Sequence, residues 1–351
     1  MPNVATFDPV TLNAVSDGGP PPLLLFLGDE SERGYAKTAY GLRDWAGERC
    51  VGELTLPGAL VTTGLPALSV TQAYERGARA MAIGVATRGG MIPANWIPTL
   101  LSALEAGLDL ISGMHVRLSS IPELVAAASR LGRELIDVRV PPASIEVGTG
   151  VRRSGWRVLT VGTDCALGKK YSALAIARGL QERGLDVTFR ATGQTGIMIS
   201  GSGMPIDAVV ADFVAGAAEM LSPSASPEHI DVIEGQGSIF HPSYASVSLG
   251  LLHGSQPDRF VVCHEPGRAA MLGMTGFALP TIKSVIVQTI ALGRLTNPDI
   301  ACAGVCLNTS AMDAVAAKRE IERTAQALGL PVADPVRGGV TFDRLLDACQ
   351  Q

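Results

Sequence analysis

The sequence predicts an α/β protein with an N-terminal Rossmann-like domain and a C-terminal P-loop NTPase-like, doubly wound domain. Short apolar runs alternate with amphipathic stretches along most of the chain, as expected for a parallel sheet covered by helices. Hydrophobic residues make up 47% of the chain and charged ones only 17%, which favours strands buried on both faces. A glycine loop containing a lysine follows one central apolar run, as at the start of a P-loop domain.

Changes in composition divide the chain into four segments. Residues 1–22 are rich in proline, glycine and aspartate, and we expect them to be poorly ordered. Residues 23–140 form the predicted Rossmann-like domain. Residues 141–155 contain a Pro-Pro pair and three glycines and read as a linker. The strand and helix pattern then restarts, so residues 156–351 form the predicted P-loop-like domain.

In the N-terminal domain, each predicted strand is followed by a predicted helix. Apolar runs that end in glycine or serine indicate buried strands, and apolar residues at helical spacing indicate the helices. Ser69 is a plausible cap for the second helix. The predicted strands are 23–27, 50–54, 80–84, 108–112 and 135–140, and the predicted helices are 35–45, 69–77, 98–106 and 122–131.

The C-terminal domain shows the same alternation. A long amphipathic helix is predicted over residues 311–328, and residues 206–219 read as a mixture of strand and helix. The other predicted elements are strands 158–161, 187–191, 230–233, 259–263, 300–307 and 331–335, and helices 171–183 and 285–292.

The glycine loop is the most informative stretch of the sequence. A strand, a glycine turn, a Gly-Lys pair and a helix together make a phosphate cradle, because backbone N–H groups, the helix dipole and the lysine all favour an anion. The loop differs from the usual P-loop signature in two ways. Five residues separate Gly162 from Gly168, and Lys170 stands where a Ser or Thr would hold Mg²⁺. Ser172 is the nearest hydroxyl that could replace it.

We assign this loop, and the polar end of a later strand, to cofactor binding. The alternative is a glycine-rich turn that holds no ligand. The predicted cofactor-binding residues are Gly162, Thr163, Asp164, Cys165, Gly168, Lys169, Lys170 and Asn308.

Two residues are predicted to act as a general base. Glu234 follows an apolar strand, where P-loop proteins place a carboxylate that binds Mg²⁺ or orients water. His241 comes shortly after it, and a histidine can accept a proton near neutral pH. The alternatives are a solvated turn for the glutamate and a structural role for the histidine.

Other polar side chains at predicted strand ends are candidates for substrate binding. The turn from Thr192 to Gly196 offers hydroxyls, an amide and bare backbone donors, and arginines can clamp carboxylates with two hydrogen bonds. Surface solvation is the alternative for any one of the cations. The predicted substrate-binding residues are Arg190, Thr192, Gln194, Lys37, His115, Arg117, His264 and Arg268.

Composition also excludes several classes of function. A net charge of −5 without a basic run argues against nucleic acid as the main partner. No apolar run is long enough to predict a membrane helix, and no signal pattern is present. The six cysteines lie mostly in apolar runs, which indicates reduced core residues in a cytoplasmic protein, and no metal site is expected. Large apolar α/β enzymes often associate, so we expect a homo-oligomer.

Several segments together resemble one bacterial family. They are Gly162-Thr-Asp-Cys-Ala-Leu-Gly-Lys-Lys, Ala191-Thr-Gly-Gln-Thr-Gly-Ile-Met-Ile-Ser-Gly, Glu234-Gly-Gln-Gly-Ser-Ile-Phe-His-Pro, Leu249-Gly-Leu-Leu-His-Gly-Ser and Cys263-His-Glu-Pro-Gly-Arg, with Ala36-Lys-Thr-Ala and Ser112-Gly-Met-His in the first half. The family is a two-domain bacterial family formerly of unknown function, whose characterised activity is D-glutamate N-acetylation. The loop spacing is also similar to that of dethiobiotin synthetase and its relatives.

The resemblance implies an N-acetyltransferase that uses acetyl-CoA in D-glutamate catabolism. A phosphate cradle can then hold the CoA phosphates without hydrolysing anything, and Glu234 or His241 would deprotonate the substrate amine. Arg190, Arg268, Lys37 or Arg117 would pair with the two carboxylates. Two other functions remain open: a ligase or kinase that depends on ATP and Mg²⁺, and a nucleotide-sensing module without catalysis.

Overall fold

The computed structural model describes residues 10–11 and 20–351, so most of the predicted poorly ordered segment 1–22 lies outside the described residues. The chain forms two compact units. The first contains the described part of Asp8–Pro142 together with Gln194–Ala208, and the second contains Ala143–Gly193 and Val209–Gln351. No helix of the described residues combines the length and the apolar character needed to cross a membrane.

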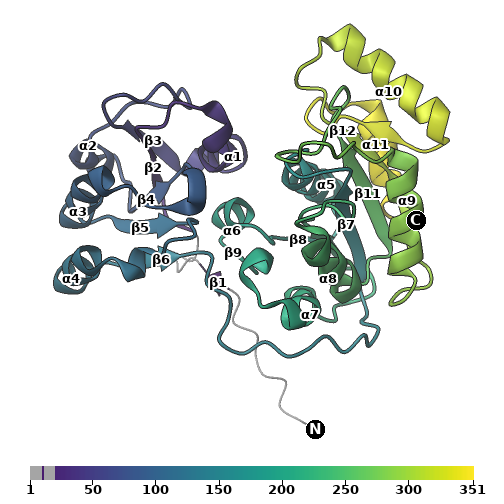
Figure 1. Ribbon diagram of the computed structural model, residues 1–351, viewed down its shortest axis with the longest axis horizontal. Coiled ribbons are helices and arrows are strands. Elements are labelled where there is room, and N and C mark those ends of the chain that lie inside the picture. The colour runs from purple at the N-terminus through teal and green to yellow at the C-terminus, as the bar shows by residue number, and fades with distance from the viewer. Residues whose placement is uncertain (1–9, 12–19) are drawn as a thin grey trace. The chain divides into compact units, whose positions relative to one another are not determined.

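The first unit is built on a five-stranded parallel sheet with the order β3-β2-β4-β5-β6. Its helices connect successive strands, as predicted for a Rossmann-like domain (Figure 1). The strands are β2 (Leu23–Gly28), β3 (Cys50–Thr55), β4 (Ala80–Ile83), β5 (Asp109–Ser112) and β6 (Leu135–Asp137), and the helices are α1 (Lys37–Trp45), α2 (Val70–Glu75), α3 (Ile97–Glu105) and α4 (Pro122–Leu131).

Local sequence explains where these elements begin and end. Every residue of β2 is buried, which fits its uninterrupted run of apolar side chains. The Ser69 side chain accepts a hydrogen bond from the backbone N–H of Gln72 at the start of α2, and the Gln72 side chain accepts one from the backbone N–H of Ser69. This capping box confirms the predicted cap. Helix α4 has Pro122 in its first turn and ends at Gly132 in the left-handed conformation.

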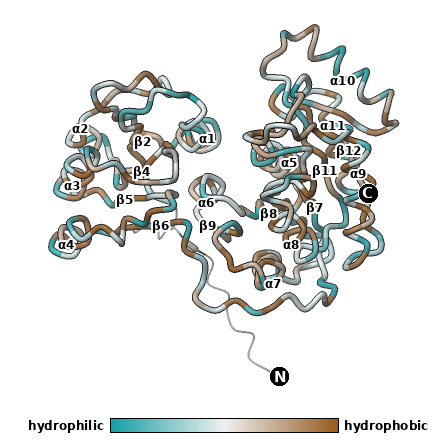
Figure 2. The backbone as a smooth tube through the Cα atoms, viewed as in Figure 1, coloured by the Kyte–Doolittle hydropathy of each residue, from teal (hydrophilic) through white to brown (hydrophobic). Residues whose placement is uncertain are grey.

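The second unit contains a six-stranded parallel sheet with the order β13-β12-β11-β7-β10-β8. In Figure 2 the hydrophobic stretches follow the central strands of each sheet. The strands are β7 (Trp156–Gly162), β8 (Val187–Arg190), β10 (Ile230–Ile233), β11 (Arg259–His264), β12 (Ala301–Leu307) and β13 (Val332–Ala333), and the helices are α5 (Lys169–Glu182), α7 (Val214–Leu221), α8 (Ala245–Ser255), α9 (Ile282–Gly293), α10 (Ala314–Leu328) and α11 (Val340–Ala348).

This strand order decides which loops meet. Strand β7 lies between β10 and β11, and β8 lies on the far side of β10. Because all of these strands are parallel, the loops that follow them leave from the same edge of the sheet. The glycine loop after β7 therefore lies beside the turns that begin at Glu234 and His264.

Two local predictions were wrong. The turn predicted from Thr192 to Gly196 is only two residues long, because helix α6 (Gln194–Ser200) begins at Gln194. This helix packs against α1 in the first unit, where the hydroxyls of Thr38 and Thr195 are 2.9 Å apart. Residues 206–219 contain no strand; they form two short 3₁₀ turns and the start of α7.

Helices α8 and α11 were not predicted, and neither was a small strand pair. Apolar and small residues of α8 occur on every face of the helix, so its sequence shows no clear helical period. The pair consists of β1 (Val10–Thr11) and β9 (Ser202–Gly203), which run antiparallel. Two-residue strands carry too few residues to show an alternating pattern.

Candidate functional site

The glycine loop after β7 turns sharply before it enters α5. Ala166 has a φ of 53° and Gly168 a φ of 105°, and Gly168 caps the helix. A Cβ atom on Gly162 would lie 3.2 Å from Nζ of Lys169, so this glycine leaves room for the lysine to fold under the loop. The strand, the sharp turn and the helix follow one another as the sequence predicts, and the use of this loop as a phosphate cradle stays a prediction.

The Lys169 ammonium is enclosed by its own loop. Nζ donates a hydrogen bond to the carbonyl oxygen of Asp164 at 2.8 Å, and the residue is buried. Burial lowers the pKa of Lys169, and the electrostatic interaction with the nearby Cys165 is the largest effect that opposes this. Lys169 therefore supplies a positive charge beneath the loop, close to Cys165.

Asp164 organises the outer side of the loop. Its carboxylate is fully buried and accepts hydrogen bonds from the backbone N–H groups of Cys165 at 2.6 Å and Leu272 at 2.8 Å. Arg268 donates to the same carboxylate at 3.1 Å and to the carbonyl oxygen of Cys165 at 2.9 Å. Arg268 also pairs with Glu265. The arginine thus neutralises Asp164 and holds the loop in place.

His241 reaches this loop from the segment after β10. Its side chain is buried, stacks on Tyr244 with ring centroids 4.6 Å apart, and accepts a hydrogen bond at Nδ1 from the backbone N–H of Ser243 at 3.1 Å. A neutral imidazole whose Nδ1 accepts a hydrogen bond carries its proton on Nε2. Nε2 is 3.9 Å from Oδ1 of Asp164 and has no hydrogen-bond partner among the described residues. His241 therefore presents a buried donor that lacks an acceptor.

Glu234 lies close enough to Lys169 to interact with its charge and is also buried. One carboxylate oxygen, Oε2, accepts hydrogen bonds from the backbone N–H groups of Thr192 at 3.0 Å and Gly193 at 3.1 Å. Burial raises the pKa of Glu234, and these backbone hydrogen bonds and the two loop lysines oppose the shift. A carboxyl group with a raised pKa is closer to the proton affinity that a general base needs near neutral pH.

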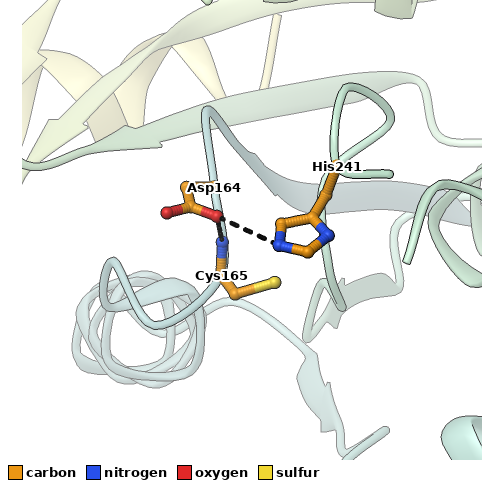
Figure 3. A group of neighbouring side chains, drawn as sticks. All are labelled: Asp164, Cys165 and His241. Atoms are coloured by element: carbon orange, nitrogen blue, oxygen red, sulfur yellow. Dashed lines mark hydrogen bonds and ion pairs between the residues drawn. The ribbon is translucent and has the colours of Figure 1, made fainter. Parts of the chain in front are cut away.

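Asp164, Cys165 and His241 form a compact group, shown in Figure 3. One donor atom from each residue lies within 4.8 Å of the others, and the set contains the atom types that bind transition metals. A metal-bound histidine normally donates its second ring N–H to a neighbour, whereas Nδ1 of His241 accepts one. The tautomer inferred from this hydrogen bond thus favours a hydrogen-bond donor over a metal ligand at Nε2.

The second unit also brings together Thr163, His264 and Asn308. The Thr163 hydroxyl is 3.0 Å from Nδ1 of His264, and the backbone N–H of Asn308 donates to the carbonyl oxygen of His264 at 2.8 Å. Burial lowers the pKa of His264. Arg190 donates to Asp231 at 2.6 Å, so its guanidinium is already engaged in an ion pair. Nζ of Lys170 lies 5.4 Å from the ring centroid of Tyr171.

The remaining predicted residues lie in the first unit, and their part in a common site stays a prediction. Lys37 is the first residue of α1 and Gln194 the first of α6. His115 and Arg117 follow β5 and are exposed. Nε2 of His115 is 2.9 Å from Nη1 of Arg139, and burial lowers the pKa of His115.

A hollow beside the glycine loop contains residues that the sequence did not single out. Its lining is mostly apolar and includes the Thr289 hydroxyl, which is buried and has no hydrogen-bond partner in the described chain. Gln236 and Ser238 belong to the Glu-Gly-Gln-Gly-Ser segment, which could have drawn attention to them. Thr289 lies inside α9, and no motif marks it. The lining residues are Leu159, Thr160, Val161, Gly162, Gly235, Gln236, Gly237, Ser238, Ile239, Ser248, Leu251, Leu252, Val285 and Thr289.

Fold and site together define a two-domain α/β protein whose C-terminal domain carries a P-loop-like loop. Residues 56–141 match a family described as a domain of unknown function, DUF1611_N, with a Rossmann-like domain, and residues 146–346 match the DUF1611_C P-loop domain. The chain belongs to the DUF1611 family. A solved structure of a DUF1611 family protein from Anabaena variabilis is 33% identical, with a TM-score of 0.83 over 94% of this chain and 99% of that one.

Two curated relatives carry a functional name. A D-glutamate N-acetyltransferase from a Pseudoalteromonas species is 46% identical over 320 residues, which is 91% of this chain and 96% of that protein. A D-glutamate N-acetyltransferase from Tritonibacter scottomollicae is 46% identical over 330 residues, 93% of this chain and 98% of that protein. The family resemblance found in the sequence motifs is thereby confirmed, as are both predicted domain types.

Proposed function

We propose that this protein is an acyltransferase that moves an acetyl group from acetyl-CoA to the amine of D-glutamate. The observation that carries the proposal is the 46% identity to two proteins of that name, over more than nine-tenths of both chains. The reaction would belong to D-amino-acid catabolism in the cytoplasm. A homo-oligomer remains our expectation for the assembled enzyme.

We assign the binding of acetyl-CoA to the glycine loop and its neighbours. The loop combines a helix N-terminus, a buried ammonium and the Arg268 guanidinium, all of which favour an anionic ligand or a developing negative charge. Its backbone turns leave Cys165 partly exposed at the tip. The assigned residues are those predicted from the sequence: Gly162, Thr163, Asp164, Cys165, Gly168, Lys169, Lys170 and Asn308.

Glu234 is our candidate for the general base that deprotonates the substrate amine. Of the two predicted bases, His241 has its Nδ1 lone pair occupied by the N–H of Ser243 and its proton on Nε2, so it is suited to donate. Glu234 has only acceptor atoms when ionised, and its burial raises its pKa. The candidates for pairing with the substrate carboxylates stay Arg190, Arg268, Lys37 or Arg117. Arg190 and Arg268 would have to share their guanidinium groups with the carboxylates that they already bind.

The test is a thiol-release assay with acetyl-CoA and a panel of D- and L-amino acids, without ATP or added metal. CoA release that depends on D-glutamate, with N-acetyl-D-glutamate identified by mass spectrometry, is the expected result. Release with another amine would correct the substrate. Turnover that appears only when Mg·ATP is added would refute the proposal and support a ligase or kinase.

A further inference from the structure

Cys165 differs from most of the cysteines in its surroundings. Cys50, Cys263, Cys306 and Cys349 are buried, whereas Cys165 is partly exposed at the tip of the glycine loop. Its Sγ lies within 4.8 Å of both a His241 ring nitrogen and an Asp164 carboxylate oxygen, on the same side as the imidazole (Figure 3). A small molecule at the loop could therefore contact this sulfur.

Two groups of positive character lie close to Cys165. The buried Lys169 ammonium attracts a thiolate at this position, and the N-terminus of α5 begins four residues further along the chain. The Asp164 carboxylate would repel an anion, but Arg268 and the N–H of Leu272 bind its second oxygen, Oδ2. These contacts therefore offset part of the repulsion from Asp164.

His241 supplies an independent indication of an anion at the same place. Its Nε2–H is buried, points toward Asp164 and Cys165, and has no acceptor within the described part of the chain. A buried donor without an acceptor costs about 1–3 kcal/mol, so such groups usually mark a missing ligand or a transient charge. Sγ of Cys165 lies within 4.8 Å of the His241 ring nitrogen, so a thiolate there would attract this donor.

We propose that Cys165 is the nucleophile of this enzyme and carries the acetyl group as a thioester between acetyl-CoA and the amine. This inference rests on the acetyl transfer proposed above. It assigns a covalent role to a residue that the loop motif alone places among ligand-binding groups.

The two half-reactions balance without any further reactant. The Cys165 thiolate attacks the thioester carbonyl of acetyl-CoA, a new C–S bond forms, and the bond to the CoA sulfur breaks, which releases CoA thiolate. The substrate amine then attacks the acetyl-cysteine, the amide C–N bond forms, and the Cys165 thiolate is regenerated. The substrate ammonium loses two protons overall; the CoA thiolate takes one, and the other passes through Glu234 to solvent.

This assignment changes which end of CoA meets the loop. The pantetheine arm separates the phosphates of CoA from its thioester, so one CoA molecule cannot place both against the same turn. Lys169 is directed at the carbonyl oxygen of Asp164, underneath the loop. We therefore place the thioester at Cys165. The sequence suggested the glycine loop as the site of the CoA phosphates, and we now place those phosphates outside it.

Isotope exchange tests the covalent step without requiring the second substrate. The full-length enzyme is incubated with acetyl-CoA and labelled CoA in the absence of D-glutamate, and label is followed into acetyl-CoA. In parallel, acid-quenched enzyme is analysed by intact mass and peptide mapping for an acetyl group on Cys165. Cys302→Ser is the matched control, because Cys302 is also partly exposed but burial raises its pKa to about 12.

We expect exchange and an acetylated Cys165 in the wild-type enzyme and in C302S, and loss of both in C165S. Exchange and adduct formation are measured on the wild-type enzyme itself. If both are absent there, the proposal fails whether or not C165S folds. N-acetyl-D-glutamate formation without exchange and without an adduct would overturn the role of Cys165 and leave the proposed function intact. Exchange and adduct without transfer to D-glutamate would support Cys165 and refute the proposed substrate.

Discussion

Two substitutions of Glu234 separate its structural role, as a hydrogen-bond acceptor, from its proposed chemical role, as a base. In Glu234→Ala, the backbone N–H groups of the buried Thr192 and the half-buried Gly193 lose their shared acceptor. An unsatisfied buried donor costs about 1–3 kcal/mol, so the expected loss of stability, which comes mainly from Thr192, is about 1–3 kcal/mol. In Glu234→Gln, the amide oxygen can still accept both hydrogen bonds, and we expect a change below about 1 kcal/mol.

Turnover should fall even in Glu234→Gln, the variant that keeps its stability. Glu234→Gln removes the proton acceptor while it keeps the loop in place, so kcat/KM for D-glutamate should fall by about 10²–10⁴-fold. The assays are denaturant unfolding of each variant and CoA release at saturating acetyl-CoA. Glu182→Gln, at the exposed end of α5, is the control for loss of a surface carboxylate. Wild-type turnover in E234Q would refute the base assignment, and wild-type stability in E234A would refute the structural one.

Four further predictions concern the same protein. Burial raises the pKa of Glu234 above its ordinary value of 4.5, so the folded protein keeps this proton at pH values where the unfolded chain has lost it. As the pH rises above 4.5, the wild-type protein should therefore lose stability relative to E234Q. Equal pH dependence of the two proteins in thermal melts would contradict this. Gly235→Ala would place a Cβ atom 1.6 Å from the carbonyl oxygen of Thr160, so it should destabilise the protein by at least about 1–3 kcal/mol, whereas Gly47→Ala meets nothing within 4 Å. Ser69→Ala should cost about 1 kcal/mol in denaturant unfolding through loss of the capping box, and an unchanged midpoint would count against it. Acetyl transfer should persist in EDTA, and its loss with recovery on adding Mg²⁺ or Zn²⁺ would restore a metal to the mechanism.

Local sequence signals were sufficient for most of the secondary structure. The buried run of β2, the Ser69 cap of α2 and the Asp313 cap of α10 are each explained by a few adjacent residues, because strand burial and helix capping are short-range effects. The motifs also indicated the family, which the comparisons confirmed.

Other elements depended on partners far away in the sequence. The Thr192–Gly196 segment was predicted as a loop, but Gln194 begins a helix, because α6 packs against α1 of the first unit and its Thr195 contacts Thr38. Helix α8 carries no amphipathic stripe, since it is enclosed by its neighbours on several sides. No local pattern can report such contacts.

The sequence by itself therefore determined the two α/β domains, the glycine loop after a central strand, and the polar residues at the strand ends. Only the tertiary structure decided how those residues are used. It turned Lys169 under its own loop, paired Arg190 with Asp231 and Arg268 with Asp164, and brought Nε2 of His241 to within 3.9 Å of Asp164. The physical reason is that Arg268 and His241 lie more than seventy residues from Asp164 in the sequence, and such residues meet only when parallel strands end side by side.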